Sequence, residues 1–307
     1  MSISAETVKM LRERTGAGMM ECKKALIETG GDVDAAAEIM RKAGLAKADK
    51  KATRIAAEGA IATAKTRDGR FAVLVEVNCE TDFVARQPEF QAFATQVAQA
   101  ALQASATDAE AVAALKLADG RTVDERRRNL VAKTGEKIDL RRVGSLRAPE
   151  RIGSYVHGIK IGTLVGMKGG DETLARNLAM HVAWANPQYL SPQEVPADIL
   201  AKEREIQVAQ AAKEGKPPEI TARIADGRLQ KYLNEISLTG QPFQQHPDKL
   251  PVGKILQSAA ATVTGILRFE VGEGIERKQE NFAAEVMAQI EAAKDKDKPE
   301  NGNRVKS

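Results

Sequence analysis

Apolar residues recur at helical spacing along much of this 307-residue chain, and alanine is frequent among them. Residues 1–44 contain three such segments, which glycine-containing turns separate. We expect Ser4 and Asp32 to cap the first and third helices, and Gly44 to end the third. A chain of about 40 residues buries little surface, so these helices predict a small module that leads into a basic, Ala-rich linker at 45–58.

Two later stretches contain strand-like runs in which apolar residues are concentrated around a turn. Residues 58–82 precede an amphipathic helix at 88–102, and residues 153–173 precede a second one at 174–185. Residues 261–272 supply a further strand. This weak internal repeat predicts a duplicated α+β core, in which each unit lays a helix on one face of an antiparallel sheet.

A helical insertion interrupts the second unit at about 197–237. Its apolar residues are spaced three or four positions apart, and once five, and "EGKPPE" at 214–219 divides them into two runs. We therefore expect an antiparallel helical hairpin. The resulting α+β architecture has core subdomains at 59–147 and 148–278, a C-terminal helix at 279–293 and a disordered tail at 294–307.

Positive charge is concentrated in one segment of the chain. The net charge is only +4, but nine Lys or Arg residues and four acids lie between Arg121 and Arg147. This excess favours an anionic partner or nucleic acid. The segment nevertheless lacks Phe, Tyr and Trp, and its acids alternate with bases at helical spacing, so a solvated basic helix with surface ion pairs is the simpler interpretation.

No pattern typical of an enzyme, a metal site or a cofactor site occurs. Cys22 and Cys79 lie in unrelated contexts, and none of the three histidines has a second ligand at metal-binding spacing. The glycine-rich turn around Lys168 imitates a phosphate loop, but Asp171 and Glu172 at the following helix start repel phosphate. Without a membrane helix or secretory signal, we predict a cytoplasmic protein that is not an enzyme.

The stretch "EVNCETDFVAR", residues 76–86, ends a strand, begins a helix and sets Asp82 beside Phe83 in the turn between them. In one interpretation Phe83 is a hydrophobic staple that folds back on the next helix, with Thr81 or Asp82 as its N-cap. In the other, Phe83 projects from a rigid turn and anchors a partner protein. The pattern of residues leaves both open.

Five motifs, at residues 11–26, 76–86, 153–165, 237–243 and 268–276, closely resemble those of the bacterial translation elongation factor Ts family. The resemblance runs in order from about residue 4 to residue 292. It implies a three-helix module like ubiquitin-associated (UBA) domains, a duplicated α+β core, an inserted coiled-coil hairpin and a C-terminal helix.

The resemblance also implies a guanine-nucleotide exchange factor for elongation factor Tu, a GTPase that holds Mg²⁺ and GDP. Thr81, Asp82, Phe83 and Val84 would be the intruding turn, with Phe83 entering an apolar pocket of the GTPase domain. The intrusion would dislocate Mg²⁺, promote GDP release and stabilise the nucleotide-free GTPase.

Further partner contacts follow from the same resemblance. Those expected on the GTPase domain are Arg12, Met19, Met20, Phe282 and Val286, and His157 would meet another domain. Ordinary packing of the small module stays an alternative for the two methionines. The partner would be elongation factor Tu, either GDP-bound or nucleotide-free. Two such heterodimers could pair, and we expect neither a membrane nor a specific nucleic acid as a partner. The chain departs from the family pattern at Glu80, where some members have glutamine, and in its longer charged tail.

Overall fold

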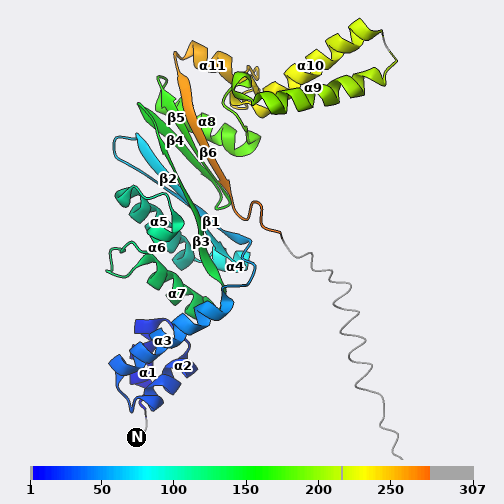
Figure 1. The fold of residues 1–307 in the computed structure, drawn as a ribbon. Helices are drawn as coiled ribbons and strands as arrows, with labels where there is room; N and C mark the ends of the chain where they lie inside the picture. Colours follow the sequence, from blue (N-terminus) through cyan, green and yellow to red (C-terminus); the bar gives the residue numbers. More distant parts are fainter. Residues whose placement is uncertain (1–2, 216, 277–307) are drawn as a thin grey trace, which may run out of the picture. The chain divides into compact units, whose positions relative to one another are not determined.

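The computed structural model describes residues 3–215 and 217–276 (Figure 1). The helices before the insertion are α1 (Ala5–Thr15), α2 (Met19–Glu28), α3 (Val33–Lys51), α4 (Asp82–Ala85), α5 (Pro88–Ala104), α6 (Ala109–Ala113), α7 (Val123–Thr134) and α8 (Glu172–Ala185). The later ones are α9 (Ala197–Ala212), α10 (Pro218–Ile236) and α11 (Val252–Ser258), with short 3₁₀ turns at Pro192–Glu194 and Leu238–Gly240. The strands are β1 (Glu58–Lys65), β2 (Phe71–Cys79), β3 (Ile138–Arg147), β4 (Arg151–His157), β5 (Ile161–Lys168) and β6 (Thr262–Glu270).

The first three helices confirm the predicted small module. The hydroxyl of Ser4 accepts the N–H of Thr7 at 3.1 Å, and the carboxylate of Asp32 accepts two N–H groups at the start of α3, so both predicted caps are present. The prediction that α3 stops at Gly44 is wrong, because the helix continues to Lys51. A single interior glycine costs about 1 kcal/mol, which the Ala-, Leu- and Lys-rich residues around it offset.

The first sheet has the order β1-β2-β3, with both pairs antiparallel. Helix α5 contacts β1 and β2 and closes the first hydrophobic core, as the hairpin-plus-helix pattern predicts. The segment expected to be one basic helix is half helix and half strand. Gly135, at φ +77°, ends α7, and β3 then alternates buried Ile138 and Leu140 with partly exposed residues alongside β2.

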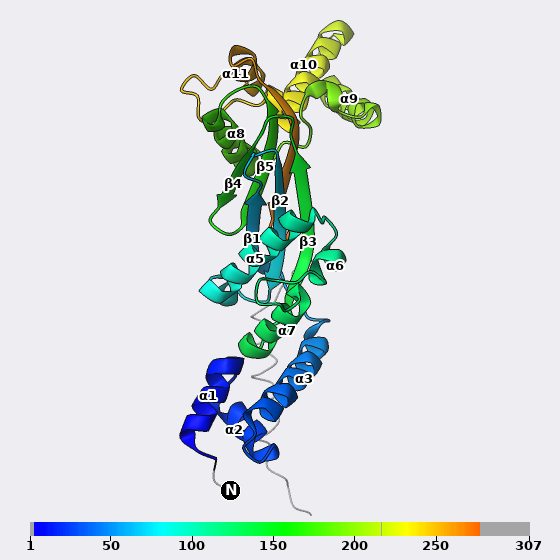
Figure 2. The same cartoon turned by 90° about the vertical axis from the view of Figure 1, so that its left-hand side faces the viewer.

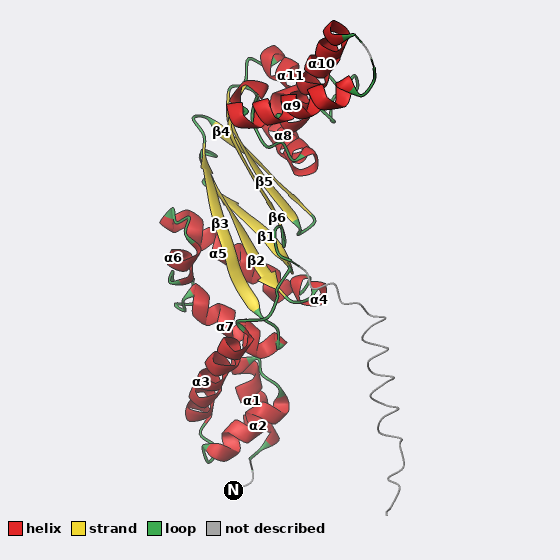
Figure 3. Ribbon diagram, turned by 45° about the vertical axis from the view of Figure 1, so that its right-hand side comes forward, coloured by secondary structure: helices red, strands yellow, loops and turns green. Residues whose placement is uncertain are grey.

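The second sheet repeats this plan with the order β4-β5-β6 (Figure 3). Helix α8 contacts β4 and β5, and its N-cap is Asp171, whose carboxylate accepts the N–H of Leu174 at 2.7 Å. The glycine-rich turn before α8 is therefore a capped helix start, as expected. At Gly153 a Cβ would lie 2.0 Å from the carbonyl oxygen of Ala175, so only glycine allows this close approach of α8 to β4.

The two sheets meet in a further apolar cluster that contains Ile61 and Leu74 from the first sheet and Leu164 and Phe269 from the second. This shared cluster joins the two halves of the duplicated core.

Helices α9 and α10 form the predicted helical hairpin (Figure 2). The chain enters and leaves this insertion at neighbouring points, because the N–H of Gln188 donates to the carbonyl of Ile236 and the N–H of Leu238 to the carbonyl of Tyr189. A small apolar cluster of its own, which includes Leu229 and Leu233, fills the base of the hairpin. The predicted helix at 279–293 and tail at 294–307 lie outside the described residues.

Candidate functional site

The junction of β2 and α4 carries the predicted site. Strand β2 is buried along its whole length and ends at Cys79. Thr81 then adopts an extended backbone and caps α4, with its hydroxyl oxygen 3.4 Å from the N–H of Val84. We refer to residues 79–85 as the Phe83 turn. Thr81 is thus an N-cap, but of the short helix α4 and not of the longer helix α5 that the sequence suggested, which begins after Gln87.

Within this turn, Phe83 points to solvent while the two residues that follow it point inward. The side chain of Phe83 is 79% exposed, whereas Val84 is 5% exposed and Ala85 is fully buried in the first core. The staple interpretation is therefore wrong, because Val84 and Ala85 already occupy the side of α4 that faces the core. The carboxylate of Asp82 lies beside Phe83 and pairs with Arg86 at 3.4 Å.

Two carboxylates tie the Phe83 turn to the loop between α7 and β3. Glu136 accepts the N–H of Thr81 at 3.0 Å through Oε2 and its hydroxyl at 2.6 Å through Oε1. In the opposite direction, Glu80 accepts the N–H of Lys137 at 2.6 Å, and the guanidinium of Arg54 lies 3.3 Å from both of its oxygens. We call Glu80 and Glu136 the carboxylate clamp.

No pattern in the sequence predicted the carboxylate clamp. Glu136 is 55 residues away from Thr81 in the chain, and no local pattern links the two. The only available signal was Gly135, which marks a turn after the helix but does not say what that turn contacts.

Cys79 is the first residue of the Phe83 turn, and its thiol contacts the backbone of the turn. Burial, together with the nearby carboxylates of Glu136 and Glu58, raises the pKa of this thiol to about 12. The group therefore stays protonated at neutral pH and donates to the carbonyl oxygen of Thr81 at 3.1 Å. It is a structural thiol rather than a reactive one.

The same region begins the match to a known family. A sequence model described as "Elongation factor TS" matches residues 80–273, which is more than half of the chain and starts within the Phe83 turn. The chain belongs to the elongation factor Ts family.

Curated relatives extend the match to nearly the full length. Elongation factor Ts of Methylococcus capsulatus is 54% identical over 294 residues, which cover 95% of this chain and 100% of the relative. The proteins of the same name from Halorhodospira halophila and Xanthomonas campestris pv. campestris are 53% and 52% identical, each over 94% of this chain and 99% of the relative. The duplicated α+β core with its helical hairpin is thus the architecture of a translation elongation factor.

The other predicted contacts of this member of the elongation factor Ts family are spread over separate elements. Arg12 on α1 is exposed, as are Met19 (43%) and Met20 (76%) at the start of α2, so the packing alternative does not hold for these methionines. Met20 and Ile27 line a shallow apolar groove on the same helix.

His157 is exposed at the end of β4, and its Nδ1 lies 3.0 Å from the hydroxyl of Tyr155. Phe282 and Val286 lie outside the described residues.

The basic segment that suggested nucleic acid is neutralised largely within the fold. Of its nine Lys or Arg residues, seven form ion pairs with acids, including Arg127 and Arg128 with Asp124 and Arg141 and Arg142 with Glu76. The ring of Phe71 lies under the guanidinium of an eighth, Arg147. This segment therefore presents little unpaired positive charge to a polyanion.

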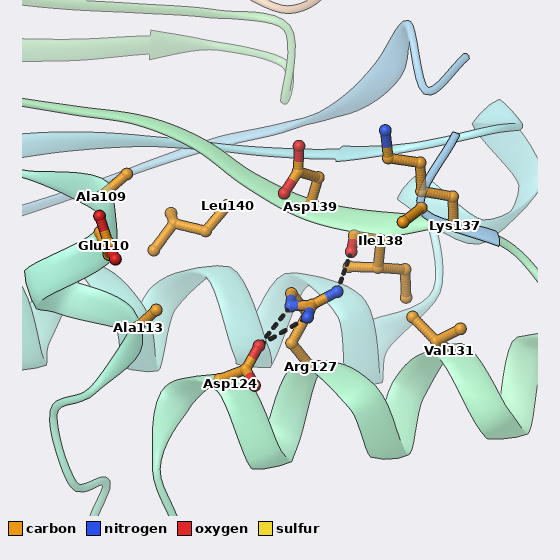
Figure 4. Close-up of a pocket in the computed structure, with 11 residues that line it drawn as sticks. Ala109, Glu110, Ala113, Asp124, Arg127, Val131, Lys137, Ile138, Asp139 and Leu140 are labelled. Carbon is orange, nitrogen blue, oxygen red and sulfur yellow. Dashed lines mark hydrogen bonds and ion pairs between the residues drawn. The ribbon is translucent and has the colours of Figure 1, made fainter. Parts of the chain in front are cut away.

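A cavity of about 380 Å³ lies between α6, α7 and the start of β3 (Figure 4). The guanidinium of Arg127 crosses it, held by the carboxylate of Asp124 and by the carbonyl oxygen of Ile138 at 2.9 Å. Asp124 and Arg127 are thus engaged with each other rather than directed at a ligand. Across the described ranges, no group of three or more His, Cys, Asp or Glu side chains is placed to hold a metal ion, and no helix has the length and apolar character needed to cross a membrane.

Proposed function

We propose that this protein is the nucleotide exchange factor of elongation factor Tu and that Phe83 drives the exchange by entering an apolar pocket of the GTPase domain. Membership of the elongation factor Ts family supports the partner. The observation that carries the role of Phe83 is its 79% exposure directly before Val84 and Ala85, which are anchored in the core. An exposed phenylalanine on an anchored turn is well suited to insertion into a partner.

The side chain of Phe83 would itself contribute binding free energy to the complex. Burying a phenylalanine that was exposed to water stabilises a complex by about 2 kcal/mol, which corresponds to roughly 30-fold in an equilibrium constant. Asp82, Val84 and Thr81 shape the turn around it: Val84 anchors α4 in the core, Thr81 caps it, and the Asp82 carboxylate stays on the surface. Aromatic anchors of this kind dominate many protein interfaces.

The chemistry of the bound metal explains how insertion would release GDP. Mg²⁺ requires near-ideal octahedral coordination, so a small shift of the GTPase elements that position its ligands weakens the metal and, with it, the diphosphate. No covalent step is needed. A factor that binds the nucleotide-free GTPase more tightly than the loaded one must, by thermodynamic linkage, weaken nucleotide binding by the same factor.

The proposed interface also includes Arg12, Met19 and Met20 on the GTPase domain and His157 on another domain of the partner. Their exposure supports these roles. A pairing of two such heterodimers stays a prediction, and the molecular mass of the complex in solution would decide it.

The test is stopped-flow release of fluorescent GDP from elongation factor Tu. We expect the wild-type protein to accelerate release by orders of magnitude, and Phe83→Ala to lose about 10- to 100-fold of that acceleration. Asp82→Ala should lose less, because its carboxylate is half exposed and pairs only with Arg86. The melting temperature of Phe83→Ala should stay close to that of the wild type, since the side chain makes no core contact.

Trp184→Ala is the matched control for this test. Trp184, on α8, is 72% exposed, so its truncation removes a similar area of exposed aromatic surface from an element outside the proposed interface. It should leave GDP release unchanged. Wild-type protein without any effect on release would refute the exchange function, and equal losses in both variants would refute the specific role of Phe83.

A further inference from the structure

The conformation of the Phe83 turn depends on contacts outside the turn. Phe83 itself contributes little packing, and the hydrogen bond from Val84 to the Thr81 hydroxyl is long, at 3.4 Å. By contrast, Glu136 holds Thr81 by two bonds at 2.6 and 3.0 Å. Hydrogen bonds to an ionised carboxylate are stronger than neutral ones, so this contact dominates the local energetics.

The loop that supplies Glu136 is fixed at both ends. On the α7 side, the hydroxyl of Thr134 donates to the carbonyl of Leu130 and accepts the N–H of Glu136. On the β3 side, Arg127 holds the carbonyl oxygen of Ile138 (Figure 4). Glu136 therefore projects from a rigid support.

Glu80 closes the contact from the opposite direction. Glu80 belongs to the turn and accepts the N–H of Lys137 in the loop, whereas Glu136 belongs to the loop and accepts the N–H of Thr81 in the turn. Because each segment supplies a carboxylate to a backbone N–H of the other, neither can shift alone without leaving a polar group unpaired. The clamp thus selects one conformation of residues 80 and 81.

We propose that Glu136, supported by Glu80, is a positioning residue for nucleotide exchange, which acts by holding the Phe83 turn in the conformation that enters the partner. This inference rests on the exchange function proposed above. Without the clamp, the turn samples several conformations, and ordering even one residue on binding costs roughly tenfold in an equilibrium constant. Glu136 needs no contact with elongation factor Tu for this role.

The variant Glu136→Gln tests the proposal, because glutamine accepts only through its oxygen and turns an N–H₂ group toward the second donor of Thr81. We expect it to lower the acceleration of GDP release about tenfold. The decisive comparison is a cycle with Phe83→Ala. If Glu136 acts through Phe83, then Glu136→Gln should cause little further loss once Phe83 has been removed.

Three further variants separate positioning from general stability. Glu89→Gln removes a different carboxylate, which joins α5 to α7 by pairing with Lys133 and Arg126 and is bonded to no residue of the turn. It should lose a similar amount of thermal stability and leave exchange unchanged. Thr81→Ser keeps both donors to Glu136 and should retain most of the activity, whereas Thr81→Val lacks the hydroxyl and should lose part of it.

The outcomes are distinct. Normal exchange by Glu136→Gln, or the same fold-loss with and without Phe83, would overturn the positioning role while leaving the exchange function intact. If the wild-type protein itself fails to accelerate GDP release, the proposed function is refuted. Amide hydrogen exchange of Thr81 in the full chain then tests whether Glu136 holds the turn. Protection that is lost in Glu136→Gln but kept in Glu89→Gln supports the clamp, and unchanged protection overturns it.

Discussion

At the scale of single residues, the buried side chain of Gln241 determines which ring nitrogen of His181 carries the proton. It is 1% exposed within α8, and its Nε2 lies 3.0 Å from Oε1 of Gln241. The amide nitrogen of Gln241 donates to the carbonyl oxygens of Glu235 and Ala185, so its oxygen faces the histidine. His181 is therefore the donor, as the neutral tautomer protonated at Nε2.

This arrangement predicts a pH dependence of stability. Burial lowers the pKa of His181, although its hydrogen bond to Gln241 opposes the shift. The unfolded chain therefore binds the proton more readily than the fold does. The free energy of unfolding should be unaffected by this residue above about pH 6.5, decline below it, and level off beneath the lowered pKa. Denaturant unfolding followed from about pH 8 to about pH 5 measures the decline.

The matched variants are His181→Gln and His157→Gln. Glutamine at position 181 still offers an amide donor but does not titrate, so this part of the decline should vanish. His157 is exposed, and its replacement should retain the decline. A His181→Gln profile that runs parallel to the wild type would show that another group titrates.

At the scale of elements, the packing of α8 on β4 depends on Gly153. A Cβ at this position would lie 2.0 Å from the carbonyl oxygen of Ala175, a backbone atom that moves only if the helix moves. We expect Gly153→Ala to lower the free energy of unfolding by about 1–3 kcal/mol, the usual cost of overpacking. Chemical denaturation at neutral pH measures the change.

Gly227→Ala provides a control with the opposite sign. Gly227 lies within α10, and a Cβ there would meet nothing within 4 Å. Because alanine favours a helix over glycine, this substitution should stabilise the protein by up to about 1 kcal/mol. Destabilisation at both positions would mean that backbone approach is not the reason for glycine at position 153.

At the scale of the whole molecule, a buried carboxylate connects the two sheets. Glu76 on β2 is fully buried and accepts from Arg141 at 3.0 Å and from Arg142 at 2.5 Å, both on β3. It also accepts the N–H of Gly272, just after β6, at 2.8 Å. Glu76 thus pairs with two arginines of the first sheet and accepts a hydrogen bond from the backbone next to the second sheet.

We expect Glu76→Gln to lower the free energy of unfolding by on the order of 2–3 kcal/mol. Glutamine keeps one acceptor oxygen, but it removes the negative charge that pairs with Arg141 and Arg142 and turns an N–H₂ group toward one of these two guanidinium groups, both of which are partly open to water. The control Asp226→Asn breaks an exposed ion pair with Arg204 on the hairpin and should change stability by less than about 0.5 kcal/mol. Equal effects of the two substitutions in denaturant unfolding would show that Glu76 does not join the sheets energetically.

The sequence by itself determined the features that depend on neighbouring residues. Helix starts at Ser4, Asp32 and Asp171 followed from side chains that cap N–H groups two or three positions onward. The paired strands and the helical hairpin followed from apolar periodicity. The turn at residues 79–85 followed from the change between a strand-like and a helix-like pattern of apolar residues. The resemblance to the family motif gave that turn its candidate role.

Only the tertiary structure decided the rest, because it depends on residues that are distant in the chain. Strand β3 was missed since its arginines make it look solvated, although two of them are engaged by buried Glu76 on the adjacent strand. The direction of Phe83 depends on whether other side chains fill the core beneath α4, and Val84 and Ala85 do so. Glu136 reaches Thr81 across 55 residues of chain. Local periodicity carries no information about such contacts, which form only when α7, β2 and β3 pack together.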